Sequence, residues 1–301
     1  MEGMVKLSFY LFAAASIAVA AAWVSYMVYG IGRIRLRHAA MATNTGITVS
    51  SSTAEFGPGS AGAGRFGTLF GWFAATFAGL AVLTRGIASH RGPYSNMYEF
   101  SLAFVFVLTL AYMLFERFYE VKQLGAIVMT IAMGMCLYLW SLPPRMREVD
   151  ALNPALQNRP LMTLHVSAAI LAYATFAVSF AAAVLFLFQL RKQVAWLPSS
   201  DMLDDIGFRA VTVGFPMLAL VLILGSIWAH RAWGAYWSWD PKETAALFTW
   251  LVYGVYLHTR SLRGWRGKRS AIILIIGFIA VAFTYYGNYF FGGLHAYGGV
   301  G

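Results

Sequence analysis

Long apolar runs separated by short polar loops dominate this sequence. A helix needs about 20 predominantly apolar residues to cross about 30 Å of hydrocarbon. Eight segments approach that length: 7–29, 66–84, 97–115, 124–142, 161–190, 211–229, 244–259 and 271–291. The pattern predicts an all-α fold, a polytopic integral membrane bundle of about eight transmembrane helices with both chain termini on one side.

The composition agrees with a membrane protein and excludes several other classes. The 301 residues are 59% hydrophobic and only 11% charged, whereas soluble domains carry about 25% charged residues. A soluble globular enzyme and a disordered chain are both excluded. The single cysteine, Cys136, lies in an apolar run. The chain therefore contains no disulfide framework, no thiol redox pair and no CxxCH site for haem attachment.

The basic residues predict the orientation in the membrane. The chain has 22 Lys and Arg against 12 Asp and Glu, and the surplus lies in loops. The loops that follow 7–29, 97–115, 161–190 and 244–259, with Arg209, hold 14 of the 22. The positive-inside rule places these loops in the cytoplasm and both termini outside. The basic surplus is thus explained by topology in a cell (plasma) membrane, and no nucleic-acid partner is expected.

The chain divides into two parts at residue 65. Residues 38–64 are rich in Ala, Ser, Thr and Gly and lack periodicity, which is typical of a flexible linker. We expect residues 1–65 to form the first transmembrane helix and a cytoplasmic linker. Residues 66–301 then form a seven-helix core, with an external loop at about 225–243.

That external loop has an unusual density of aromatic residues. It contains Trp228, Trp233, Trp237 and Trp239, four of the ten tryptophans in the chain. An interfacial aromatic belt is one interpretation, because Trp and Tyr favour the membrane surface. A shelf for a large, flat, apolar ligand is the other. Asp240 followed by Pro241 also fits the N-cap and first turn of the next helix.

Two histidines are expected on the same side as this loop. His165 lies near the outer start of 161–190, and His295 follows the outer end of 271–291. Two neutral imidazoles can hold a haem iron from both axial faces. Arg231, Lys242, Arg145 and Arg147 are cations available for the haem propionates. Alternatively, each histidine is an interfacial polar group bonded to backbone.

His258 lies near the inner end of 244–259, on the helical face shared by Trp250 and Gly254. An ionisable residue within a span suggests function. The sequence shows no second histidine at this depth, so a partner subunit could supply one. Alternatively, His258 is a helix-end residue that reaches the interface. His90 and His230 could be ligands but are expected as polar loop groups. Ser95 or Asn96, with Glu99 three or four residues on, resembles a helix start.

Four separated motifs resemble one known family. They are HRGPYSNMYEFS at 90–101, PLMTLHVSAAILAY at 160–173, WGAYWSWDPKE within 228–260, and YFFGGLHAYG at 289–298. Together they resemble the CcsA/ResC family (also called CcsB) of cytochrome c biogenesis, haem-handling membrane proteins with a tryptophan-rich WWD domain. The resemblance covers nearly the whole chain from residue 66 onward, with the motifs in the family's order.

The resemblance implies a cytochrome c synthase (haem lyase) of the System II type. It implies that haem b is an iron-ligated substrate, held by His165 and His295 beside the WWD loop, with His258 as a ligand within the membrane. The loop residues implied at the site are Trp228, Arg231, Trp233, Trp237, Trp239 and Asp240. The implied partners are a ResB/Ccs1-type membrane protein, a thiol reductant protein and an apocytochrome c with a CxxCH motif.

Three other functions remain open. A haem-delivery protein of the CcmC type shares the WWD loop, but usually has fewer spans and no counterpart of His258. A respiratory b-haem subunit would place histidine pairs at matched depths within four helices, a pattern absent from this sequence. A membrane scaffold with incidental histidines would bind no haem.

Overall fold

The computed structural model describes residues 2–43, 58–92, 94–149, 156–157, 159–194, 196–262, 265–287 and 293–295, with side chains from 33 to 60 and that of Arg159 left out. These residues form helices and loops, with no strand among them. The α-helices are α1 (Glu2–Thr43), α2 (Pro58–Ser89), α3 (Met97–Tyr119), α4 (Gly125–Ser141), α5 (Arg159–Lys192), α6 (Ser200–Trp233), α7 (Pro241–Ser261) and α8 (Lys268–Tyr286). Two short 3-10 helices, η1 (Lys122–Leu124) and η2 (Pro144–Arg147), lie before and after α4.

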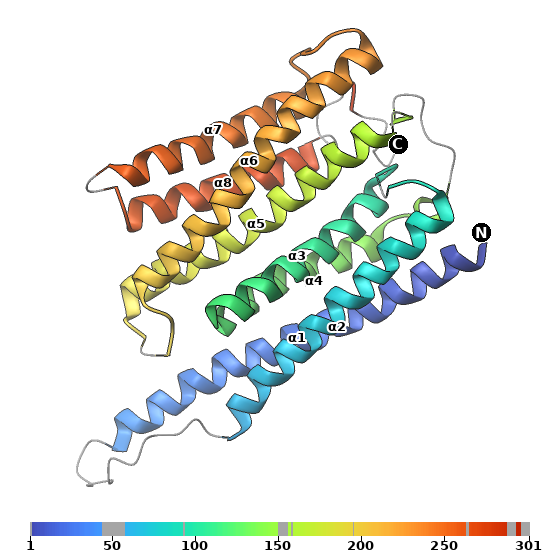
Figure 1. Cartoon of the computed structure of the whole chain (residues 1–301). Helices are drawn as coiled ribbons and strands as arrows, with labels where there is room; N and C mark the ends of the chain where they lie inside the picture. The colour runs from blue at the N-terminus through green and yellow to red at the C-terminus, as the bar shows by residue number, and fades with distance from the viewer. Residues whose placement is uncertain are drawn as a thin grey trace.

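The expected all-α membrane bundle is confirmed. Seven of the α-helices are long and apolar enough to cross a membrane, and α7 is the exception among the eight expected spans. Helix α7 forms where it was expected, but its threonines, tyrosines, His258 and Arg260 dilute its apolar character. It lies alongside α6 and α8 in the bundle (Figure 1).

Several helices extend beyond the spans expected from the apolar runs. Helix α1 continues to Thr43 and α2 begins at Pro58, so both ends of the expected linker 38–64 are helical. Residues 44–57 lie outside the described residues. Apolar runs identify only the part of a helix that faces lipid or protein. Helical turns in the polar sequence on either side are therefore not predicted by them. Helix α8 ends at Tyr286, before the expected end at 291.

The helices pack as two groups joined through α3 and α5. Helices α1 and α2 form an antiparallel pair beside α3 and α4, while α5, α6, α7 and α8 form the second group (Figure 1). Small residues allow the close approach of α1 to α2: Ala15 and Ala22 on one helix, and Ala74, Ala78 and Ala81 on the other, are almost fully buried. Such small-residue faces are typical of helix pairs in membranes, where dispersion contacts drive association.

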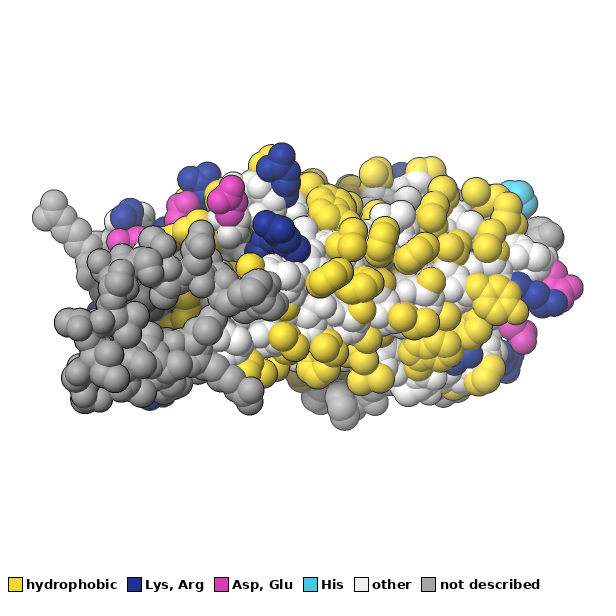
Figure 2. Space-filling model, turned by 90° about the horizontal axis from the view of Figure 1, so that it is seen from below, with side chains coloured by type: hydrophobic (Ala, Val, Ile, Leu, Met, Phe, Trp, Pro, Cys, Tyr) yellow, Lys and Arg dark blue, Asp and Glu magenta, His cyan; other side chains and the backbone are white. Residues whose placement is uncertain are grey.

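The outer surface of the bundle is apolar. Figure 2 shows hydrophobic side chains over the middle of one face, with charged side chains toward its two ends. Large apolar residues are widely exposed around the bundle, among them Ile17 (72%), Ile223 (56%) and Ile279 (62%). A surface of this kind fits lipid rather than water.

One end of the bundle concentrates the chemistry expected from the sequence. We call it the cavity end; it comprises the end of α2, the start of α3, the start of α5, the end of α6, the start of α7 and residues 293–295. The N-terminus and the end of α8 lie at this same end (Figure 1). The end of α7, with His258, lies at the opposite end of the bundle.

Candidate functional site

A cavity that is partly open to the outside lies at this end of the bundle. Residues from the loop before α3 and from α5, α6, α7 and α8 line it, and its walls are mostly apolar. His165 and His295, 130 positions apart in the sequence, both line this one cavity. Trp228, Trp237 and Lys242 line it as well.

His165 is held by α6. Its Nδ1 lies 3.0 Å from the carbonyl oxygen of Val221. A carbonyl only accepts, so Nδ1 carries the proton and Nε2 is the imine nitrogen that can ligate a metal. The ring fits because residue 225 is glycine: a Cβ at Gly225 would lie 2.8 Å from Cε1 of His165.

His295 is held by Asp240. Its Nδ1 lies 2.8 Å from Oδ1 of Asp240, and Oδ2 of Asp240 accepts a 2.7 Å hydrogen bond from the backbone N–H of Leu294. Gly293 permits this turn, since a Cβ there would collide with the Asp240 carboxylate. An imidazole bonded to a carboxylate through one nitrogen is a common arrangement for a metal ligand.

The charge states of this pair follow from its surroundings. Burial alone would raise the pKa of Asp240, but the hydrogen bond and charge of His295 and two backbone N–H donors lower it to about 2. Burial lowers the pKa of His295 below its usual 6.5, although Asp240 opposes this effect. At neutral pH a neutral imidazole therefore faces an ionised carboxylate, the protonation state that metal ligation requires.

The start of α7 explains why Asp240 lies where it does. Asp240 is the N-cap of α7 and Pro241 takes the first helical position, as expected from the sequence. Glu243 completes a capping box and accepts hydrogen bonds from the backbone of Ser238 (2.9 Å) and Asp240 (3.3 Å). These contacts fold the loop back on itself, with Trp239 in a left-handed conformation (φ 58°).

The four tryptophans of the loop take different positions. Trp228 is almost fully buried and packs edge-on against Trp233, with ring centroids 4.6 Å apart. Trp233 in turn packs edge-on against His295 at 4.9 Å. Trp237 lines the cavity, while Trp239 is 70% exposed and does not. The rings of the loop therefore differ in placement: Trp228 and Trp237 line the cavity, and Trp239 faces outward.

The remaining expected residues lie away from the cavity. Arg231 is exposed on the last turn of α6, and His230 stacks on Tyr236 with centroids 4.2 Å apart. His258 is exposed near the end of α7 and is not brought near His165 or His295. Gly254, on the same face of α7, lies beside Phe215, whose ring would be 3.6 Å from a Cβ at this position.

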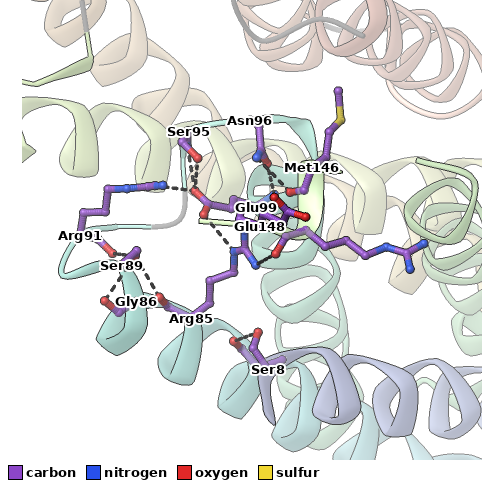
Figure 3. Close-up of polar contacts among 12 residues, drawn as sticks. Ser8, Arg85, Gly86, Ser89, Arg91, Ser95, Asn96, Glu99, Met146 and Glu148 are labelled. Carbon is purple, nitrogen blue, oxygen red and sulfur yellow. Dashed lines mark hydrogen bonds and ion pairs between the residues drawn. The ribbon is translucent and has the colours of Figure 1, made fainter. Parts of the chain in front are cut away.

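A buried ion cluster at the cavity end was not expected from the sequence. Glu99, fully buried, pairs with Arg85 Nε at 2.9 Å and with Arg91 Nη1 at 2.6 Å (Figure 3). It also accepts hydrogen bonds from the backbone N–H and hydroxyl of Ser95. Asn96 caps α3 by accepting from the backbone N–H of Glu99 at 3.0 Å, which confirms the predicted helix start.

This cluster shapes one wall of the cavity. Ser95 and Asn96 line the cavity, and Glu99 fixes Ser95 by accepting a hydrogen bond from its backbone N–H. Arg85 also donates to the backbone carbonyls of Arg147 and Glu148, at 2.5 and 2.7 Å (Figure 3). The available signal was three charged residues within 15 positions, two between the apolar runs and Glu99 at the start of the second run. Charges that close to a membrane core require partners.

The metal-ligating side chains that line the cavity include two histidines. Among the described residues, no three His, Cys, Asp or Glu side chains converge to hold an ion. A haem iron needs at most two protein ligands, because the porphyrin supplies the other four. Two histidines in a cavity with aromatic walls match that requirement.

Comparisons with known proteins agree with these features. The family described as "Cytochrome C assembly protein" matches residues 94–295. The cytochrome c biogenesis protein CcsA of Chlamydomonas reinhardtii is 39% identical over 228 residues, 73% of this chain and 64% of that protein. The CcsA protein of Mesostigma viride is 34% identical over 263 residues, 77% of this chain and 86% of its own length.

A solved structure shares the fold. The cytochrome c haem lyase CcmF aligns with a TM-score of 0.58 at 18% identity, over 92% of this chain and 46% of that chain. This likeness concerns the arrangement of helices, and this chain spans under half the length of that protein.

Proposed function

This chain belongs to the cytochrome c assembly protein family, and we propose that it is the haem-handling subunit of a System II type cytochrome c synthase. In this role it receives haem b as an iron-ligated substrate, holds it reduced at the cavity end, and promotes its attachment to an apocytochrome c. The cavity end, with its WWD loop, faces the extracytoplasmic side of the cell membrane.

The observation that carries this proposal is the pairing of His165 and His295 in one cavity. Each imidazole is held through Nδ1, by the Val221 carbonyl and by the Asp240 carboxylate, so that Nε2 is the ligating nitrogen of both. Two such nitrogens would bind the iron from opposite faces of the haem. The porphyrin plane would then lie between α5 and the turn at 293–295.

The aromatic residues support the flat substrate. Trp228 and Trp237 form part of the apolar wall of the cavity, and Trp233 packs edge-on against the ring of His295. Positioning is the main contribution such a site makes to catalysis, because it presents the substrate in a reactive orientation. Arg231 and Trp239 lie on the exposed side of the loop, where a part in haem binding remains a prediction.

The client protein supplies the reacting groups. Each cysteine thiol of its CxxCH motif adds across one haem vinyl group: a C–S bond forms, the vinyl π bond is lost, and the thiol hydrogen goes to the neighbouring carbon. The step involves no net oxidation, and the single buried Cys136 of this chain is not needed. A thiol reductant protein keeps the client cysteines reduced. The client histidine then replaces His165 or His295 on the iron, which releases the product.

His258 supports the need for a partner. It is exposed on α7 beside Leu251 and Val255, which are 49% and 52% exposed, and its ring makes no hydrogen bond to a described residue. We propose that a ResB/Ccs1-type membrane protein covers this surface and supplies a second ligand, so that His258 takes part in receiving haem from the cytoplasmic side.

The absorption spectrum of the protein purified with its partner tests the proposal. A six-coordinate low-spin haem is expected after reduction with dithionite, and His165→Gly or His295→Gly should weaken or alter this spectrum and abolish cytochrome c maturation. Imidazole added to either variant should partly restore both. His230→Gly, on an exposed ring outside the cavity, is the matched control. A double His165→Gly, His295→Gly variant that matures cytochrome c fully would refute the proposal.

A further inference from the structure

Lys242 is a cation that lines the cavity and forms no contact ion pair with a described residue. It lies in the first turn of α7 and lines the cavity together with His165 and His295. Its backbone N–H donates to Asp240. Its ammonium group makes no hydrogen bond and no ion pair with any residue that the structure describes.

The two nearest carboxylates along the chain are already engaged. Asp240 accepts hydrogen bonds from His295 and from the backbone of Lys242 and Leu294. Glu243 accepts from the backbone of Ser238 and of Asp240, and from the Ser238 hydroxyl. The charge of Asp240 acts on the ammonium group through space, but no ion pair joins the two side chains.

The other cations at the cavity end are placed differently. Arg85 and Arg91 share the buried Glu99. Arg147 packs over the rings of Phe9 and Trp140, with its guanidinium 5.2 and 5.6 Å from their centroids. Arg145 and Arg231 are exposed. Of these cations, Lys242 is the one that lines the cavity.

A charge beside an apolar cavity that has no partner in direct contact is stabilised when a ligand brings the opposite charge into contact. We propose that Lys242 binds a carboxylate of the substrate, namely a propionate of the haem. This inference rests on the proposed function, because it assigns a role within the same site. It makes Lys242 a positioning residue rather than a ligand of the iron.

The contact would decide which edge of the haem faces which wall. Two axial histidines fix the plane of the macrocycle but leave it free to rotate about the iron. The propionates lie on one edge of the haem and the vinyl groups on the other side. A propionate bound at Lys242 therefore turns the vinyl groups away from the start of α7, and presents them to the client thiols in one orientation.

Binding of two probes that differ only at the carboxylates tests the inference. Haem b and its iron-containing dimethyl ester are titrated against the partner complex carrying the native chain, Lys242→Met or Lys242→Arg. The native complex should prefer haem b over the ester by about 10- to 100-fold, the size of a charge-assisted hydrogen bond. Lys242→Met should lose this preference while retaining the low-spin bis-histidine spectrum, and Lys242→Arg should restore most of it.

The outcomes separate this inference from the proposed function. An unchanged affinity of Lys242→Met for the ester shows that the variant is folded. If the native complex binds neither probe with a low-spin spectrum, the proposed function itself fails. If haem binds but Lys242→Met keeps its preference for haem b, only the Lys242 assignment is overturned. The matched variant Lys192→Met, at an exposed position at the end of α5, should keep the preference. An equal loss of preference in that variant would show that the effect does not arise in the cavity.

Discussion

The two ends of the bundle treat their histidines in opposite ways. At the cavity end, His165 and His295 are half-buried, and each has Nδ1 bonded to an acceptor on another segment. At the opposite end, His258 is exposed on α7 and its ring has no hydrogen-bond partner among the described residues. The first arrangement is preorganised by this chain, whereas the second needs another protein to complete it.

The two buried carboxylates of α3, one toward each end of the bundle, also differ in their partners. At the cavity end, Glu99 is paired with two arginines. Toward the other end, Glu116 accepts hydrogen bonds from the hydroxyls of Tyr26 (2.5 Å), Tyr112 (2.6 Å) and Thr68. Glu116 joins α1 and α2 to α3, so it secures helix packing, whereas Glu99 secures the loop that lines the cavity. Substitutions that remove these contacts one at a time test how far each contact supports the cavity end.

Removal of the Glu99 carboxylate should have the largest effect. Glu99→Ala leaves two buried arginines without their partner, which costs about 3–5 kcal/mol of folding free energy. Thermal unfolding of the protein in detergent, followed by circular dichroism, measures the loss. Glu148→Ala, which removes an exposed carboxylate at the same end, is the control and should change the unfolding temperature little. Equal effects of the two variants would contradict the role given to the cluster.

Asp240→Asn should have the next largest effect. Asparagine can still cap α7, but it replaces the charged acceptor of the His295 N–H by a neutral one. The hydrogen bond to His295 is thereby weakened by about 1–2 kcal/mol. The haem affinity of the partner complex should fall by roughly tenfold. Titration followed by the absorption of the low-spin haem measures it. Asp201→Asn, at an exposed position on α6, should leave the affinity unchanged.

Gly225→Ala tests the packing of His165 against α6. The added methyl would stand 2.8 Å from Cε1 of His165, so the ring or α6 must shift, which disturbs the contact of Nδ1 with the Val221 carbonyl. We expect a several-fold loss of haem affinity and a partial change from low-spin to high-spin haem, because a 1 Å displacement weakens an oriented ligand.

Gly134→Ala is the matched substitution for Gly225→Ala. It also lies within a helix, but a Cβ there meets no atom within 4 Å. Alanine should therefore leave the spectrum unchanged and stabilise α4 by up to about 1 kcal/mol. A spectral change of equal size in both variants would show that the effect of Gly225→Ala does not arise at His165.

His258→Gly should have the smallest effect on the cavity end. The substitution lies at the far end of α7, so the low-spin spectrum and the haem affinity of the cavity should stay unchanged. The partner complex should nevertheless bind less haem in total, because its second site loses one ligand. Quantification of haem per complex, compared between the native chain and the variant, measures this difference. Loss of the cavity spectrum would show that the two ends are coupled.

Some of the site followed directly from local sequence. The Asp240–Pro241 pair predicted the start of α7, because capping depends on neighbouring residues only. Ser95 or Asn96 with Glu99 predicted the start of α3, and the structure selects Asn96 as the N-cap. The alternation of apolar runs also placed His165 and His295 at the same end as the aromatic loop. Counting membrane crossings is enough for that conclusion, since each span reverses the direction of the chain.

The sequence by itself determined the helices, their order and the end at which the chemistry gathers, because these depend on hydrophobic length and on caps. Only the tertiary structure decided which tryptophans line the cavity, that Glu99 joins two arginines, and that Val221 and Asp240 orient the two imidazoles. Those contacts join residues up to 56 positions apart. They depend on how the helices rotate and approach one another, which no local pattern specifies.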